Sequence, residues 1–269
     1  MQSRRLISVI AALLGCVSIA SAHEFWVRPS QYEATPGQLG RFFLLHGHRF
    51  EGEFVPRNEP YVKRFEIIDA EGTQQVMGRH GQLTNLARLR TAGTSVVAYE
   101  SEEVLSELGP ERFAAYLEEQ GLDHVAKQRD ALGETDQPGI EMYARCAKAL
   151  VRVEGEGSGL EDRVVGLPLE IVLEPLDSAS AGRQVRVRVL YLGEPMANAR
   201  VVAVSQQAAS SGTSSAQVVR TDAEGYAPIE LDRSGPWMLT CLHMFRTDDR
   251  DDADWKSFWA SLTFALSEG

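Results

Sequence analysis

The sequence predicts a mainly β protein made of two antiparallel β-sandwiches, with a short helical insert in the first. Short runs of aromatic and β-branched residues recur along most of the chain, and apolar and polar positions alternate within them. Turn signals rich in Gly, Pro and Asp separate these runs. The period becomes helical only between residues 101 and 150, which we interpret as the insert.

The first 22 residues have the features of a cleaved export signal. Two arginines at positions 4–5 precede an uncharged apolar run over residues 6–19, and Ala20 and Ala22 form an A-x-A cleavage site. The apolar run is shorter than the ~20 residues of a transmembrane helix. We therefore expect a periplasmic protein that does not span the membrane once the signal is removed.

Cleavage after Ala22 makes His23 the first residue of the mature protein. An alternative is a lipoprotein, because residues 13–16 resemble a lipobox and would allow acylation of Cys16, which would leave His23 inside the chain. Loss of the two leader arginines changes the formal net charge from −11 to −13. This acidic balance argues against nucleic acid as a partner and suits the attraction of cations.

The first sandwich is expected over residues 23–158. After a turn-rich segment, residues 41–50 form an aromatic-rich strand. Counting by two places His46 and His48 on one face of it, with Phe42, Leu44 and Phe50. Further strands are predicted over residues 61–68 and 94–100.

The helical insert is expected over about residues 101–150. Ser101 has the chemistry of a helix cap, and apolar residues at 104, 105 and 108 recur at helical spacing. Short amphipathic helices are predicted over residues 111–119, 122–132 and 140–150.

The Gly-rich segment 155–159 is the best candidate for a boundary, and residues 159–269 form the second sandwich. Seven short strands at this spacing fit an immunoglobulin-like fold. They are predicted over residues 169–173, 184–192, 199–205, 216–220, 227–231, 237–244 and 260–266. The mature chain contains Cys146 and Cys241, which either pair in the periplasm or, as we favour, remain two buried thiols.

Several segments together resemble a bacterial periplasmic family of unassigned function that is grouped with the substrate-specific (NikM-like) components of nickel and cobalt uptake systems. The segments are residues 22–26, 47–50, 143–151, 166–171, 193–195, 221–225, 235–237, 243–244 and 255–264. The resemblance covers nearly the whole mature chain. It implies a periplasmic role in handling transition metals, and no particular reaction.

Four histidines are candidate metal ligands: His23, His46, His48 and His243. An N-terminal His23 offers both an imidazole and an α-amine, and such nitrogen donors suit Cu(II), Ni(II) or Co(II). His46 and His48, two apart on a strand, can chelate together, whereas participation of His243 requires the two halves to pack against each other. Each of them also has the ordinary interpretation of a packed or surface residue. Glu24 is either an oxygen ligand or, as we favour, an exposed strand residue, and His80 and His124 are expected to be solvated.

We therefore expect a non-catalytic periplasmic protein that binds nickel, cobalt or copper for uptake or handling. A membrane metal transporter or an outer-membrane receptor is the possible partner. One alternative is a structural or interaction module of the envelope that binds no metal. Another is a histidine-brace copper monooxygenase, which also begins with His and a β-sandwich.

Overall fold

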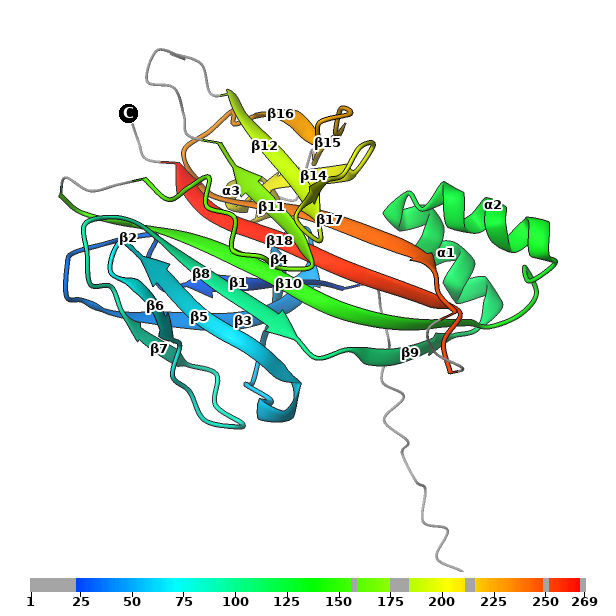
Figure 1. Ribbon diagram of the computed structural model, residues 1–269, viewed down its shortest axis with the longest axis horizontal. Coiled ribbons are helices and arrows are strands. Elements are labelled where there is room, and N and C mark those ends of the chain that lie inside the picture. Colours follow the sequence, from blue (N-terminus) through cyan, green and yellow to red (C-terminus); the bar gives the residue numbers. More distant parts are fainter. Residues whose placement is uncertain (1–22, 156–158, 175–183, 211–215, 249–251, 267–269) are drawn as a thin grey trace, which may run out of the picture.

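The computed structural model describes residues 23–155, 159–174, 184–210, 216–248 and 252–266 (Figure 1). The predicted export signal, the alternative acylation site at Cys16 and residues 156–158 of the predicted boundary lie outside the described residues. Strands dominate the described part of the chain, and they form three sheets that pack as layers. The predicted mainly β class is confirmed.

The first sheet comprises β1 (Glu24–Pro29), β3 (Leu39–His48), β4 (Glu51–Val55) and β7 (Asn85–Arg88). The central sheet runs in the order β15 (Gln217–Arg220), β14 (Arg200–Ser205), β17 (Gly235–Arg246), β18 (Trp255–Leu266), β10 (Gly139–Val153), β8 (Gly93–Ser101), β5 (Val62–Asp69) and β6 (Gly72–Gln75). The short strands β2 (Glu33–Ala34) and β9 (Val104–Leu108) also pair with β10. The third sheet comprises β11 (Leu169–Leu173), β12 (Gln184–Tyr191), β13 (Glu194–Pro195) and β16 (Tyr226–Glu230).

The central sheet continues from the N-terminal half of the chain into the C-terminal half. Strands β10 and β18 pair in parallel from Glu141 opposite Trp255 to Ala149 opposite Thr263, and the two long strands lie side by side in Figure 1. The other pairings in this sheet are antiparallel, apart from that of β2 with β10. The two predicted sandwiches therefore share one sheet.

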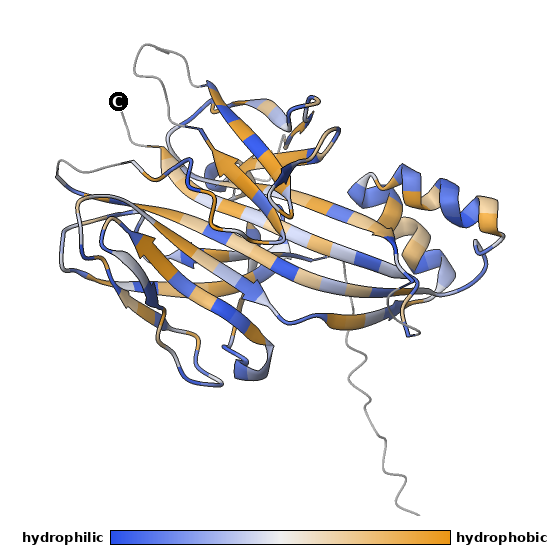
Figure 2. Cartoon of the chain, in the orientation of Figure 1, coloured by the Kyte–Doolittle hydropathy of each residue, from blue (hydrophilic) through white to orange (hydrophobic). Residues whose placement is uncertain are grey.

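Each face of the central sheet covers a hydrophobic core. On one face β5, β8 and β10 pack against Phe25, Val27 and Leu44 of the first sheet. On the opposite face β10, β17 and β18 pack against the third sheet, including Val187 and Val189 of β12. Residues on β12 alternate between buried and partly or fully exposed, and the banding of apolar and polar residues along this strand is visible in Figure 2. The alternation is what a sheet with one covered face requires.

The expected helical insert is partly wrong. Helices α1 (Pro110–Gln120) and α2 (Asp123–Leu132) are present and pack beside the ends of β17 and β18. However, residues 104–108 form β9, and residues 140–150 lie within the 15-residue strand β10. Most of β10 is buried because it lies in the middle of a sheet covered on both faces, so its sequence lacks the alternation that identifies a strand.

All seven strands predicted in the C-terminal half are present, the last of them beginning earlier, at Trp255. Two further short helical segments are the 3₁₀ turn Glu59–Tyr61 and α3 (Gln206–Ser210). Among the described residues, no helix has both the length and the apolar character needed to cross a membrane.

Candidate metal and ligand site

The pairing of β1 with β3 brings the beginning of the described chain next to two of the predicted histidines. In the antiparallel register, Glu24 lies opposite Gly47 and Phe25 lies opposite His46. His23 immediately precedes β1, and its ring contacts that of His46. Side chains alternate along a strand, so His48 projects on the same face of β3 as His46. We call His23, His46 and His48 the histidine cluster.

Two of the rings in the histidine cluster lie close together. The rings of His23 and His46 meet edge to face with their centroids 5.3 Å apart. Nδ1 of His48 lies 3.6 Å from Oε1 of Glu119, which is near the end of α1, and both side chains are about half exposed. The cluster therefore lies at the surface, where the first sheet meets α1.

The electrostatic surroundings favour a neutral His23. Burial lowers the pKa of His23 below its usual 6.5, and His46, Arg145 and His48 lower it further, whereas Glu119 raises it. An imidazole must be unprotonated to bind a metal ion. At neutral pH His23 thus has the protonation state of a ligand.

His243 does not join this cluster. It lies on β17, and its ring contacts Tyr191, at 4.6 Å between centroids, and Phe245. Tyr191 belongs to the third sheet, so His243 faces the opposite side of the central sheet from β1. Burial, and next His124, lower the pKa of His243 to about 4. The two halves do pack together, as participation of His243 would require, but they do not bring His243 to His23.

Three other predictions about polar residues can be judged. Glu24 is buried, contrary to expectation, and its carboxylate accepts a hydrogen bond from the backbone N–H of Arg49 at 2.6 Å. His80 is exposed as predicted, and its Nδ1 accepts a hydrogen bond from the backbone N–H of Glu59. His124 is also exposed, although its Nε2 lies 2.9 Å from the carbonyl oxygen of Met244.

The two cysteines provide no metal ligands. Cys146 and Cys241 are free and buried, as we favoured. Burial raises the pKa of each thiol to about 12, so neither is a thiolate at neutral pH. Within the described ranges, no group of three or more His, Cys, Asp or Glu side chains is arranged to hold a metal ion. A complete site at the histidine cluster would therefore require a further donor, such as the α-amine of a processed His23.

A cavity of about 240 Å³ adjoins the histidine cluster, and the sequence did not predict it. Its walls include Phe25 and His46 from the first sheet and Tyr99, Tyr143 and Arg145 from the central sheet. We call it the Arg145 pocket. It brings together residues that are more than 100 positions apart in the sequence, which explains why no local pattern revealed it.

Arg145 is fixed in this pocket by contacts on several sides. Its guanidinium lies over the rings of Phe25 and Tyr143, at 5.1 and 5.2 Å from their centroids. It also donates a hydrogen bond of 3.1 Å to the carbonyl oxygen of His23. In the part of the chain that the structure describes, no carboxylate forms an ion pair with Arg145. Arg145 is thus a positioned cation that lines a cavity.

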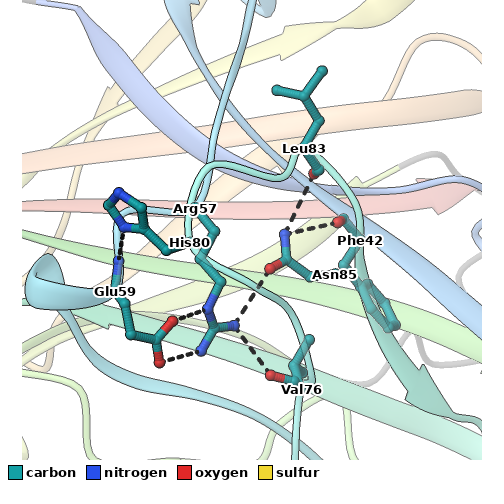
Figure 3. A network of polar contacts seen from close by, with 7 residues as sticks. All are labelled: Phe42, Arg57, Glu59, Val76, His80, Leu83 and Asn85. Atoms are coloured by element: carbon teal, nitrogen blue, oxygen red, sulfur yellow. Dashed lines mark hydrogen bonds and ion pairs between the residues drawn. The ribbon is translucent and has the colours of Figure 1, made fainter.

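One wall of the pocket is formed by the segment after β4, which a network around Arg57 holds in place (Figure 3). The buried Arg57 donates hydrogen bonds to the side chains of Glu59 and Asn85 and to the carbonyl oxygen of Val76. Asn85 in turn donates to the carbonyl oxygen of Phe42. These bonds tie the wall to β3 and β7, so the pocket has a rigid boundary on this side.

Comparison with known proteins identifies the family but no activity. Comparison with curated proteins gave no match. Solved structures that the chain resembles include the D0–D1 domain of intimin, with 13% identity, coverage of 89% of this chain and 97% of that one, and a TM-score of 0.24. Another is the group of fibronectin(III)-like modules of CbhA from Clostridium thermocellum, with 9% identity, coverage of 90% and 97%, and a TM-score of 0.21. Likenesses this low carry no argument about function.

The family model of DUF4198, a domain of unknown function, matches residues 20–245. This match covers most of the chain, including the histidine cluster and Arg145. The chain therefore belongs to the DUF4198 family.

Proposed function

We propose that the protein is exported to the periplasm and binds one Ni(II), Co(II) or Cu(II) ion at the histidine cluster, for uptake or handling of the metal and without catalysing a reaction. The observation that carries the proposal is the 5.3 Å separation of the His23 and His46 rings. A metal–imidazole bond is about 2.0–2.1 Å long. Two rings this close can therefore each turn one nitrogen toward the same ion. His48 also lies on β3, but its ring contacts Glu119 and would have to reorient to become a third donor.

Removal of the export signal completes this ligand set. If cleavage follows Ala22, the α-amine of His23 adds a nitrogen donor beside its own imidazole. The amine has an ordinary pKa of about 7.7–8.0, so the metal must displace its proton and binding will strengthen as the pH rises toward 8. The resemblance of the sequence to a family grouped with NikM-like components of nickel and cobalt uptake supports this choice of cargo, and a membrane transporter is the partner that such a role requires.

Native mass spectrometry of untagged protein from the periplasm, together with the intact mass under denaturing conditions, tests the proposal. We expect a polypeptide that begins at His23 and retains or takes up one metal ion. A chain that begins at His23 but takes up no added Ni(II), Co(II) or Cu(II) would contradict the proposal, and would favour an interaction module of the envelope. An acylated chain that begins at Cys16 would remove the amine donor and contradict the site as well.

A further inference from the structure

The Arg145 pocket has the composition of a binding site for a small organic anion. Its aromatic side chains, among them Phe25, Tyr99 and Tyr143, offer flat apolar surfaces, and Arg145 supplies a positive charge. The volume of about 240 Å³ is below the range of about 300–1,000 Å³ typical of pockets for drug-sized ligands. The occupant is therefore a molecule with one ring or a short chain.

The contacts of Arg145 indicate which group of the ligand it recognises. The rings of Phe25 and Tyr143 cover the guanidinium, and one N–H is bonded to the carbonyl oxygen of His23, which leaves other N–H groups at its edge. Glu141, four residues earlier on the extended strand β10, accepts hydrogen bonds from the hydroxyl groups of Tyr116 and Ser257. An arginine held in this way is suited to a carboxylate, which it can bind through two N–H groups.

His46 connects the pocket to the histidine cluster, because it lines the one and belongs to the other. Where the histidine cluster adjoins the Arg145 pocket, it supplies only nitrogen donors. Ni(II) and Cu(II) sites commonly combine nitrogen with oxygen ligands. We propose that the pocket binds a small carboxylate-bearing chelator together with the metal, so that the cargo is a metal–chelate complex rather than a bare ion. This inference rests on the proposed metal-binding function.

The experiment is calorimetric titration of processed protein with NiCl₂ alone and with NiCl₂ plus one equivalent of pyridine-2-carboxylate. This probe has one flat ring, one carboxylate and two donor atoms. In the wild type we expect the chelate to bind at least about fivefold more tightly than Ni(II) alone, the lower end of typical coupling between two ligands. Arg145→Gln should lose this gain, whereas Arg41→Gln, which alters an exposed arginine outside the pocket, should keep it.

Arg145 also bonds to His23, so its replacement could disturb the metal ligands directly. Val104→Trp gives an independent test, because Val104 lines the pocket without belonging to the histidine cluster. It should abolish the gain and leave the affinity for Ni(II) alone within about twofold. Binding of Ni(II) that the probe does not strengthen, or a gain that survives both pocket variants, would overturn the inference while the proposed function stands. Absence of Ni(II) binding in every protein would overturn the proposed function itself.

Discussion

At the scale of single residues, His46 is the histidine with the greatest consequence for the proposed site, since it contacts both His23 and the Arg145 pocket. We predict that His46→Ala lowers the affinity for Ni(II) by about tenfold or more, the loss expected when a ligand or its support is removed. The measurement is calorimetric titration. His80→Ala is the matched control, because His80 is exposed, lies outside the histidine cluster and contacts Glu59. Equal affinities in wild type and His46→Ala would exclude His46 as a ligand.

The lowered pKa of His243 predicts that the stability of the protein depends on pH, independently of metal binding. Its pKa is lowered from 6.5 to about 4, chiefly by burial, so between these values the unfolded chain binds a proton that the folded chain does not. The free energy of unfolding should therefore fall as the pH drops from about 6.5 to 4. The shift sets an upper limit of about 3 kcal/mol, which the partial exposure of the ring reduces.

The check is urea denaturation at several pH values, comparing wild type with His243→Phe. Phenylalanine retains an aromatic contact with Tyr191 and Phe245 but does not titrate. The variant should lose part of the acid sensitivity between pH 6.5 and 4. Identical slopes for the two proteins in this range would show that His243 is not responsible.

At the scale of elements, the close approach of β3 and β4 holds the histidine-bearing strand in place. Gly47 lies opposite Gly52 in this pair, between the two histidines of β3. A Cβ at Gly47 would lie 2.0 Å from the backbone oxygen of Glu51 and 2.5 Å from the Cα of Gly52. Only glycine permits this approach, because the obstructing atoms are backbone and cannot rotate away.

We predict that Gly47→Ala destabilises the protein by about 2 kcal/mol or more and weakens metal binding, since β3 must shift to relieve the clash. Gly109→Ala is the control: its φ is −58°, and a Cβ there meets no atom within 4 Å. Thermal denaturation and Ni(II) titration of both variants measure the two effects. A Gly47→Ala protein with wild-type stability would show that the two strands tolerate a wider separation.

Alternation between two different faces is one signal by which the sequence reveals a strand, although β11 is also predicted and all five of its residues are buried. β12, with buried valines between more exposed polar residues, was predicted with nearly correct ends, and so was the histidine-bearing β3. β10 was mistaken for a helix over residues 140–150, because alanine and leucine favour helices and both faces of the strand are covered. The same strand carries Arg145, which accounts for the unpredicted pocket.

The candidate site is predictable only where its residues are close in sequence. His46 and His48 follow from the period of two, whereas the proximity of His23 depends on the pairing of β1 with β3, which the sequence did not predict. The contact of Arg145 with His23 spans 122 positions and depends on how the sheets pack. The location of His243 depends on the same packing, which no local pattern encodes.

At the scale of the whole molecule, the two halves are joined by the central sheet and by a buried ion pair. Nζ of Lys148 in β10 lies 2.8 Å from Oε1 of Glu170 in β11, and both side chains are 1% exposed. The Glu170 carboxylate also accepts hydrogen bonds from the backbone N–H groups of Val165, Gly166 and Leu167. The segment that leads into the second half thus folds around the Glu170 carboxylate, and the counter-ion of this carboxylate, Lys148, belongs to the first half.

We predict that Lys148→Met destabilises the protein by about 3–5 kcal/mol, because it leaves the Glu170 carboxylate buried without its counter-ion. Lys127→Met, which alters an exposed lysine of α2, should change the stability by less than about 0.5 kcal/mol. Adding Glu170→Gln to Lys148→Met should recover part of the loss, since it removes the uncompensated charge.

The measurement is urea denaturation followed by far-UV circular dichroism and by tryptophan fluorescence. The two signals should change together, because a sheet shared by both halves makes them unfold as one unit. Separate transitions would mean that the pairing of β10 with β18 is too weak to couple them, and Lys148→Met would then destabilise only one half.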